Sequence, residues 1–513
     1  MPDVTPLGTN FDLGFQSDTS RDELNVRAAF RMWDYIPQLE APLRKRGGWT
    51  YGSPDLSTIG LGSGVASIGW LPFAGDGQLA VVGVGGKVIQ LKRFDGTGGT
   101  LLTDTGDTSI VPTWPVFWHK AGSFAGGLIL GGLNQTGKVP KKYLGSTVAP
   151  LGGTPPQARM GFSWGEYLVL GNFYDSGGLK NYRLAFSEPG DPEAAWTHED
   201  PTNGSRLDFP EEIVAGVPVQ NAILVFGYTD CHLVTGDIPP PSGNLARKIM
   251  FAGQGTFDGR SVVGWRQFAI WANNTGVWMS DGATLTDLAA DGGISMYYRQ
   301  QVKGLSFVTG GSAVAQIYRD HYILVLKSVT GAVTTLVCDI ARRVWTIWTN
   351  VKASCFAHRA SAPGTATSSS DEELFFGSAT TARIGLVSTL YSPSTNPALA
   401  RDADGQPVQP VLETPYYRQG KLSSKRVRFV YAGYDLRSTA NARLAMAYTL
   451  SPEPGAPYVS MVSLPATSTY LRKRVRFARH GLGFGLRLQQ MGPSEETRLY
   501  SLEAEGHPLE LMR

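Results

Sequence analysis

The sequence predicts an all-β protein, namely a β-propeller of about seven blades (six to eight) plus a small C-terminal antiparallel β-sandwich-like domain. Three observations predict this fold: one pattern of short strands recurs about seven times, glycine and proline are frequent, and helical stripes are scarce. The chain has 513 residues, which is more than one hydrophobic core usually serves. We therefore expect several domains or one large array of repeats.

The recurring pattern is a small-residue opening, an apolar strand, a turn of Gly, Asp or Asn, and a second strand that carries aromatic residues. Its copies begin near Ser67, Val116, Met160, Val217, Val262, Ala313 and Ser354. The steps of 41 to 57 residues are in the range of propeller blades. In the fifth copy the turn is Asn273-Asn274, a dipeptide that tolerates the positive φ of tight hairpins. A small sheet cannot bury both faces alone, so we expect the blades to stack radially.

The composition agrees with many short strands. The 62 glycines and 32 prolines show no three-residue period, so they are expected to mark turns. Hydrophobic residues make up 42% of the chain and charged residues 17%, which excludes a disordered chain. The best helical stripe is residues 21–36, and we expect helix to be minor.

Changes of composition along the chain predict four segments. Residues 1–60 are an N-terminal arm with the first strands, and residues 61–390 are the propeller. Residues 391–409 are rich in Pro, Ser, Asn and Asp and are predicted to be a linker to the C-terminal β domain, residues 410–513. The polar stretch 360–371 is predicted to be a long exposed loop of the last blade.

The C-terminal part is the basic end of the chain. Residues 401–513 hold 16 Lys and Arg against 10 Asp and Glu, whereas the rest holds 30 against 33. Two similar basic strands lie there, and an acidic surface of a neighbouring subunit or DNA could face them. A plain solvated strand face is the alternative interpretation. The candidate contact residues are Lys425, Arg426, Arg428, Arg472, Lys473, Arg474 and Arg476.

We expect no cofactor, no metal and no membrane span. Cys231, Cys338 and Cys355 have no C-x-x-C spacing and are predicted to be buried residues of a protein folded in a reducing cytosol. No two of the seven histidines are three or four residues apart, as a local metal site would require. The N-terminus lacks the features of a signal peptide, and no apolar run approaches the roughly 20 residues of a membrane span.

One stretch of the sequence is a candidate nucleotide-binding loop. Residues 132–138 match the spacing of a phosphate-binding loop, but the next residue is Val139 instead of Ser or Thr. Pro140 and Gly145 then disfavour the helix that such a loop needs. We predict a hairpin turn here, and another turn at the glycine-rich residues 60–64.

Propellers also include glycosidases, in which one carboxyl group acts as acid and another as base or nucleophile at the bond that is cleaved. The candidates are Glu211 with Glu212, and Asp371, Glu372 and Glu373. Adjacent carboxylates point to opposite faces of a strand, and Asp371 with Glu373 would border a loop. Aspartate boxes of the sialidase type are also missing. We therefore predict that the chain is not an enzyme, and that its 12 Trp, 20 Tyr and 22 Phe serve the blade core more than sugar stacking.

Several short motifs occur in an order that resembles a known family. Near the start are Asn25-Val26 and the Lys-Arg-Gly-Gly stretch of residues 42–49. The other matching motifs are residues 184–192 with Trp196, 223–227 with 232–237, 276–282, and 479–488 with 501–505. This order resembles the propeller-containing tail proteins of double-stranded DNA phages, such as the tail nozzle and packaged-DNA-stabilising proteins. The resemblance covers most of the chain.

The resemblance implies a structural virion protein that is made in the bacterial cytoplasm and assembles into a ring, usually six-fold. Such a ring would sit at the head-to-tail connection or tail tip as a nozzle or adaptor, and it would line or seal the DNA exit channel. Its partners would be other copies, adjoining tail or adaptor proteins, and passing double-stranded DNA bound without sequence specificity. Two alternatives remain: a tail-tip propeller that binds host-surface glycans, and a propeller glycosidase.

Overall fold

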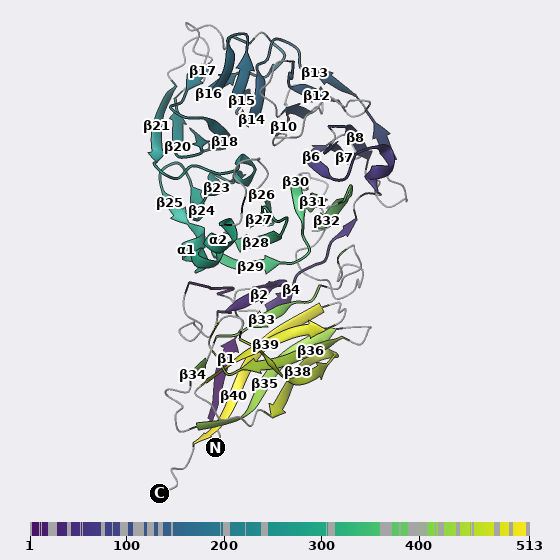
Figure 1. The fold of residues 1–513 in the computed structure, drawn as a ribbon, viewed down its shortest axis with the longest axis vertical. Coiled ribbons are helices and arrows are strands. Elements are labelled where there is room, and N and C mark those ends of the chain that lie inside the picture. Colours follow the sequence, from purple (N-terminus) through teal and green to yellow (C-terminus); the bar gives the residue numbers. More distant parts are fainter. Residues whose placement is uncertain are drawn as a thin grey trace.

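A computed structural model gives the fold of the chain (Figure 1). It describes residues 3–9, 11, 13–18, 28–37, 43–51, 53, 55–72, 77–84, 86–92, 101–105, 117–120, 128–131, 137–144, 147–194, 196–197, 206–220, 222–236, 245–303, 305, 313–359, 372–378, 381–387, 402, 408–415, 417–418, 425–437, 442–451, 453, 456–476, 483–491 and 496–508. The prediction of an all-β fold with a propeller and a second β domain is confirmed.

The described part of the propeller contains seven units of four antiparallel strands. Their strands are β6 (Val65–Pro72), β7 (Gly77–Gly83), β8 (Val88–Lys92), β9 (Leu101–Asp104); β10 (Phe117–Lys120), β11 (Leu128–Gly131), β12 (Lys141–Tyr143), β13 (Val148–Pro150); β14 (Gln157–Trp164), β15 (Tyr167–Asp175), β16 (Gly178–Phe186), β17 (Arg206–Asp208); β18 (Ile213–Val219), β19 (Ala222–Gly227), β20 (Cys231–Thr235), β21 (Ala246–Phe251); β22 (Val263–Trp265), β23 (Phe268–Ala272), β24 (Val277–Ser280), β25 (Leu285–Asp287); β26 (Ala313–Tyr318), β27 (His321–Lys327), β28 (Val333–Asp339), β29 (Val344–Trp348); and β30 (Ala353–Arg359), β31 (Glu373–Ser378), β32 (Ile384–Val387), β5 (Thr50–Tyr51). The predicted starts of the repeats lie within four residues of the first strand of each unit.

The units are arranged around a common centre, with the first strand of each unit innermost (Figure 1). Neighbouring units bury their faces on one another. Ile323 and Val325 of β27, for example, pack with Leu374 and Phe376 of β31 in one apolar cluster. The last unit is completed by β5, which comes from the N-terminal part of the chain and pairs with β32. This pairing ties the two ends of the propeller together.

Helices are minor, as predicted. Those described are α1 (Leu288–Asp291), α2 (Ser295–Val302) and the 3-10 turns η1 (Leu56–Ile59) and η2 (Gly259–Ser261). The helical stripe proposed for residues 21–36 is wrong where the structure describes it, because residues 31–33 and 35–36 form strands. Met32 and Tyr35 are fully buried there, so pairing with distant strands overrides the local helical pattern.

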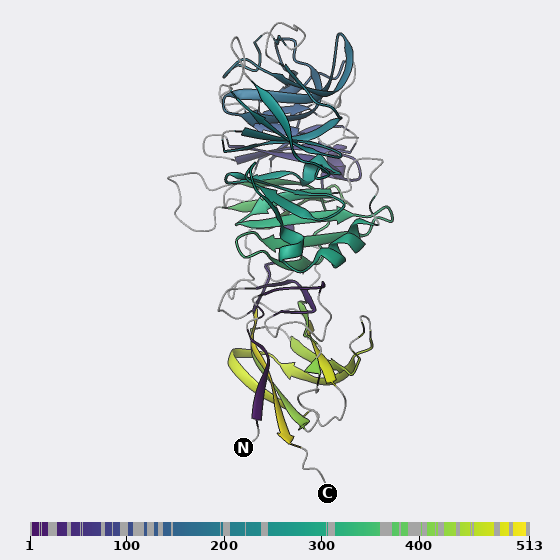
Figure 2. The same cartoon turned by 90° about the vertical axis from the view of Figure 1, so that its left-hand side faces the viewer.

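The second domain is a sandwich of two sheets, with both chain termini at its far end (Figures 1 and 2). Its strands are β1 (Asp3–Thr9), β2 (Arg31–Trp33), β3 (Tyr35–Ile36), β4 (Leu43–Lys45), β33 (Val411–Glu413), β34 (Tyr417–Arg418), β35 (Lys425–Arg437), β36 (Arg443–Thr449), β37 (Val459–Pro465), β38 (Thr467–Arg476), β39 (Gly483–Met491) and β40 (Glu496–Pro508). One sheet has the order β3-β4-β40-β35-β38, with β1 also on β40. The N-terminal strands therefore belong to the same sheets as residues 410–513, whereas the sequence suggested a separate arm.

The other sheet of the sandwich continues into the propeller. Strand β2 lies between β33, which it pairs with antiparallel, and β29, the outer strand of the sixth unit, which it pairs with in parallel. The result is one ten-stranded sheet that runs from β26 to β37. One continuous apolar core extends along it, from Leu336 in the propeller to Leu488 in the sandwich. The two domains are therefore joined by a shared sheet and a shared core.

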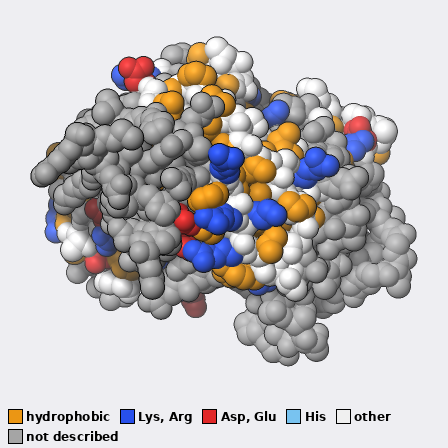
Figure 3. Space-filling model, turned by 90° about the horizontal axis from the view of Figure 1, so that it is seen from below, with side chains coloured by type: hydrophobic (Ala, Val, Ile, Leu, Met, Phe, Trp, Pro, Cys, Tyr) orange, Lys and Arg blue, Asp and Glu red, His pale blue; other side chains and the backbone are white. Residues whose placement is uncertain are grey.

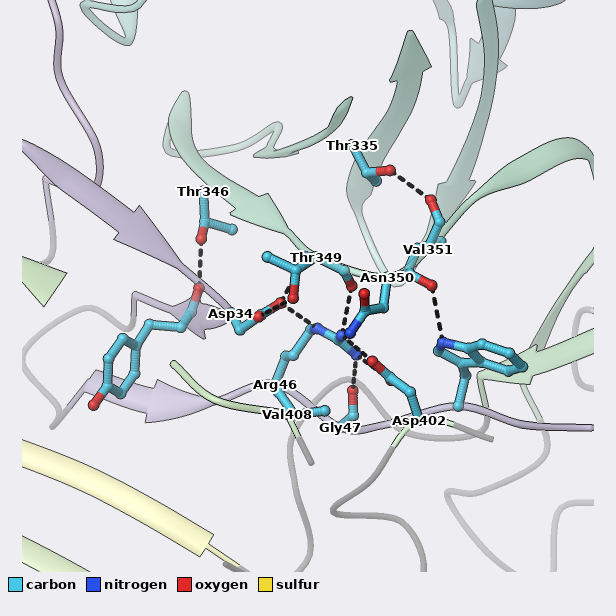
Figure 4. Close-up of polar contacts among 12 residues, drawn as sticks. Asp34, Arg46, Gly47, Thr335, Thr346, Thr349, Asn350, Val351, Asp402 and Val408 are labelled. Atoms are coloured by element: carbon cyan, nitrogen blue, oxygen red, sulfur yellow. Dashed lines mark hydrogen bonds and ion pairs between the residues drawn. The ribbon is translucent and has the colours of Figure 1, made fainter. Parts of the chain in front are cut away.

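A buried ionic cluster lies at the junction of the domains (Figure 4). The Arg46 guanidinium donates to Asp34 at 2.6 Å and to both carboxylate oxygens of Asp402 at 3.1 and 3.0 Å. It also donates to the backbone carbonyls of Gly47 and Thr349. Burial opposes the charge of Arg46, but Asp402 and Asp34 outweigh it and raise the pKa of Arg46 above its usual value. We call Arg46, Asp34, Thr349 and Asp402 the Arg46 cluster.

Neutralising Asp402, which belongs to the Arg46 cluster, should lower the free energy of unfolding more than neutralising Asp291, which lies outside the cluster. Replacing Asp402 by Asn leaves a buried guanidinium with one carboxylate, and we expect a loss of about 3 kcal/mol in the free energy of unfolding. Replacing Asp291 by Asn removes only a partly exposed pair with Arg343, and we expect a loss below about 1 kcal/mol. Urea unfolding followed by tryptophan fluorescence would check both variants. Equal shifts of the two midpoints would contradict the role of the cluster.

Candidate functional site

The predicted basic residues lie on two neighbouring strands of one sandwich sheet, β35 and β38. These strands pair antiparallel, with Tyr431 opposite Arg474 and Gly433 opposite Arg472. Val430 on β35 and Val475 on β38 point into the apolar core. Because side chains alternate along a strand, Arg472 and Arg474 lie on the outer face of the sheet. Strand β38 is the last strand of this sheet.

Two of the arginines form a ladder with aromatic rings and glutamates, which we call the arginine ladder. Arg472 lies 4.5 Å from the centre of the Tyr431 ring and forms an ion pair with Glu503. Arg474 lies 3.4 Å from the centre of the Phe429 ring and is 3.1 Å from Glu505. The glutamates come from β40, on the other side of β35. Each arginine thus reaches across a ring to a carboxylate, so the two cations are neutralised within the sheet.

The tyrosine of the ladder takes part in the same network. The Tyr431 hydroxyl donates a hydrogen bond to Glu505. This hydrogen bond is the main cause that raises the pKa of Tyr431 above its usual value. Glu505 therefore binds both Tyr431 and Arg474, and its side chain is only 7% exposed. The ladder is a fixed polar surface on the sheet.

Lys473 and Arg476 differ from the two ladder arginines. Both side chains are exposed, and neither has an ion pair among the residues that the structure describes. The backbones of Lys425, Arg426 and Arg428 lie on β35, while their side chains are outside the described part. Figure 3 shows Lys and Arg side chains interspersed with hydrophobic side chains at the sandwich end of the molecule. The structure therefore places the seven predicted residues on adjacent strands and leaves their role a prediction.

The residues that the sequence interpretation missed are Glu503, Glu505, Phe429 and Tyr431. Their alternation along β40 and β35 is visible in the sequence as Glu-Ala-Glu and Phe-Val-Tyr. That pattern could have shown that each pair shares one face of a strand. It could not have shown that these strands lie beside β38, because strand order is set by tertiary structure.

The structure disagrees with a nucleotide site at residues 132–138. Gly137 has a φ of +78° and Lys138 leads through Pro140 into strand β12, so no helix follows. Residues 132–136 lie outside the described residues. The glycine-rich residues 60–64 likewise lead into strand β6. Both stretches form turns before strands where they are described, as predicted.

The candidate carboxylate pairs have structural partners. Glu211 accepts hydrogen bonds from the backbone N–H groups of Thr229 and Asp230 and lies 3.1 Å from His232 Nε2. Glu212 instead pairs with Arg159 at 2.8 Å. The two neighbours therefore serve different contacts, as expected for adjacent carboxylates.

The second carboxylate group is also divided. Glu372 lies 2.8 Å from His358 Nε2, and Glu373 pairs with Arg359 at 3.2 Å. Asp371 lies outside the described residues. Within the bounds that the structure gives them, the seven innermost strands contain no Asp or Glu. These strands are β6, β10, β14, β18, β22, β26 and β30. An acid and base pair facing the propeller axis would have to come from outside these strands.

Aromatic side chains are largely internal. No Trp among the described side chains is exposed, and the exposed aromatic rings found there are Tyr228 and Tyr470. Tyr228 follows β19 in the propeller, whereas Tyr470 belongs to β38 of the sandwich. The described residues thus form no cluster of exposed rings on one propeller face.

One open cavity of about 600 Å³ lies between the second and third propeller units. It is lined by Tyr174 and Trp196, by Pro155 and Pro156, and by polar residues that include Asp175. Trp196 donates to the carbonyl of Pro192 and is mostly buried, so it forms part of the wall. The cavity has rings and a carboxylate, the groups that contact sugars in many binding sites.

The described residues contain no group of three or more His, Cys, Asp or Glu that could hold a metal ion. None of the helices described is long and apolar enough to cross a membrane.

Comparisons with known proteins identify no family for this chain. No protein-family model matches the chain, and no curated protein matches it. Among solved structures, an exo-β-1,3-galactanase of Phanerochaete chrysosporium bound to β-1,3-galactotriose has a TM-score of 0.29 and 9% identity, covering 84% of this chain and 95% of that one. AztD of Citrobacter koseri has a TM-score of 0.28 and 8% identity, covering 54% of this chain and 70% of that one. Likeness at this level carries no argument about function.

The three cysteines are free and buried, as predicted, so their thiols should react slowly in the native protein. Burial raises the pKa of Cys355 to about 11, and it also raises the pKa values of Cys231 and Cys338 above their usual value. Since the thiolate is the reactive form, we expect a thiol reagent at pH 8 to label none of them within minutes in the native protein and all three in urea. Absorbance or mass measurement would check this. Rapid labelling of the native chain would contradict the burial.

Proposed function

We propose that the chain is a structural virion protein of a tailed bacteriophage. In this proposal it is a ring-forming tail component, a nozzle or adaptor or a tail-tip protein, that lines or seals the DNA exit channel. It acts as a building block and not as an enzyme. Its partners are further copies in a ring, which the family resemblance makes six-fold, and adjoining tail or adaptor proteins. Its place is the virion tail.

The observation that carries the proposal is the ten-stranded sheet shared by propeller and sandwich. Together with the Arg46 cluster and the common core, this sheet couples the two domains mechanically. A rigid two-domain body suits a wall that must hold its shape while DNA passes. Enzymes with two domains more often place a cleft and a hinge between them.

The chemistry of the described residues supports a role without catalysis. The carboxylates predicted as candidates are engaged with histidine, arginine or backbone groups, apart from Asp371, which is not described. The innermost strands carry no acidic residue as described. A glycosidase would require two carboxylates about 5 to 10 Å apart on either side of one bond. The proposal therefore leaves the glycosidase alternative aside.

The arginine ladder favours a subunit contact over a DNA contact at this sheet. Binding to DNA gains free energy when cations replace the counterions of phosphates. Arg472 and Arg474 already pair with Glu503 and Glu505, so they have less charge to offer a phosphate. Passing DNA in the proposed channel would be contacted without sequence specificity and only weakly. A weak attraction also suits a conduit, since strong binding would retain the genome.

The cavity beside Tyr174 and Trp196 favours a second candidate function, the binding of host-surface glycans at a tail tip. This function and a structural role are compatible in one protein. Oligosaccharide binding by the purified chain that is lost in Tyr174→Ala would support glycan binding in this cavity, and no binding by the wild-type chain would count against it.

The proposal predicts a closed ring that depends on charge. We expect mass photometry and negative-stain images of the purified chain to show a ring at low salt, with a hole wide enough for a DNA duplex, and smaller species at high salt. Changing Lys473 and Arg476 to Glu should weaken assembly about ten-fold, because both cations are exposed.

The matched control changes Lys248 and Lys327 to Glu, since both are exposed and lie on the propeller strands β21 and β27 instead of on β38. It has the same change of net charge and should leave the ring intact. A wild-type chain that stays monomeric at all salt concentrations would count against the proposed function.

A further inference from the structure

One sandwich sheet ends in β38 on one side, and on the other side β1 lies along β40 beside the pair β4 and β3. Within the described residues, β38 pairs with β35 alone and β1 pairs with β40 alone. We propose that β38 of one copy pairs with β1 of the next copy, so that this sheet continues from subunit to subunit around the ring. This inference rests on the proposed function and names the contact through which the ring closes.

The directions of the strands allow this pairing. Strand β1 is antiparallel to β40, β40 to β35, and β35 to β38. The two edge strands therefore run in opposite directions. A rotation about an axis along the strands keeps these directions, so β1 of the next copy arrives antiparallel to β38. Antiparallel ladders are the slightly more stable kind, and the sheet continues without a change of pattern.

The positions of the two edges also fit a head-to-tail contact. In Figure 1, β1 lies on one side of the sandwich and β38 lies on the other. Each copy therefore offers two different surfaces that face away from each other, as a heterologous ring requires. Because the sandwich is fixed to the sixth propeller unit through β2, the contact would also fix the propellers around the ring.

The charges on the two strands select between copies paired head-to-tail and copies paired about a two-fold axis. Strand β38 contains Arg472, Lys473, Arg474 and Arg476 and no acidic residue. Arg472 and Arg474 are paired with glutamates, but two β38 strands side by side would still bring the exposed Lys473 and Arg476 of both copies together, which destabilises a strand pair. Strand β1 has one charged residue, Asp3. The charges on β38 therefore disfavour pairing between two β38 strands and do not disfavour pairing between β38 and β1.

Apolar side chains at the β38 edge add to the contact. Tyr470 is 51% exposed and Leu471 is 36% exposed, and Val459 at the start of the preceding edge strand β37 is 49% exposed. Exposed apolar residues surrounded by charged ones are typical of interfaces. Figure 3 shows hydrophobic and basic side chains next to one another on the face of the molecule at the sandwich end.

The outer edges of the propeller are less suited to strand addition. Long free edges invite pairing, and proteins usually shorten or cover them. The described outer strands β9, β13, β17, β25 and β5 have two to four residues, and β29 is covered by β2. Strand β21, with six residues, is longer. Strand β38, with ten residues, is the longest free edge among these.

Disulfide trapping between two single-cysteine variants tests the contact. One variant carries Lys473→Cys on β38, and the other carries a single cysteine at one of the seven β1 positions, Asp3–Thr9, so that every register is sampled. Each pair is co-expressed with different affinity tags and oxidised. We expect a disulfide between the two variants for at least one β1 position, because opposed Cβ atoms in a sheet lie about 5 Å apart. The native cysteines are buried and should stay silent.

The matched control pairs Lys473→Cys with Leu179→Cys, since Leu179 is 52% exposed but lies on the third propeller unit. This pair should give no disulfide. A disulfide of Lys473→Cys with itself would overturn the head-to-tail contact in favour of a two-fold one. Rings that form without any disulfide in the β1 series would overturn the strand pairing and leave the proposed ring standing. If neither rings nor disulfides form, both the inference and the proposed function are overturned.

Discussion

The structure depends on one buried guanidinium, that of Arg46. A charge removed from water is strongly destabilising unless it is paired and fully hydrogen-bonded. Arg46 meets this demand with two carboxylates and two backbone carbonyls, supplied by residues 34, 47, 349 and 402. These residues come from the N-terminal strands, the end of the sixth propeller unit and the segment before the C-terminal domain. The folded arrangement of these three segments is therefore the one that satisfies Arg46.

Asp34 has a second part in this arrangement. Its φ of +56° places it in the left-handed region, which Asp tolerates better than most residues. It stands between β2 and β3, and at this point the chain leaves the ten-stranded sheet and enters the other sheet of the sandwich. Its carboxylate also accepts hydrogen bonds from the N–H and hydroxyl of Thr349. One residue thus turns the chain between two sheets and anchors it to the propeller.

The junction between the domains fixes how the edge strands of the sandwich are oriented relative to the propeller. Strand β2 pairs with β29 at Trp33 and Ile347, so a rotation of the sandwich against the propeller would break the sheet at this point. The directions of β1 and β38 are consequently fixed relative to the propeller as well as to each other. In the proposed ring, this constraint would turn a local strand pairing between copies into a defined angle between whole subunits. A ring with a reproducible number of copies requires such an angle.

Local patterns in the sequence are enough to predict the elements of this protein. Alternating apolar residues and Gly, Asp and Asn turns are local signals, so the repeat starts, the all-β class and the two basic strands could be predicted. Which strands are neighbours follows from the tertiary structure alone. Thr50 and Tyr51 complete the last unit beside residues 385 and 386, and β40 brings Glu503 and Glu505 to the arginines of β38. Such pairings join residues that are far apart in the chain, and the free energy that selects them comes from burial and cross-strand contacts, which no local pattern encodes.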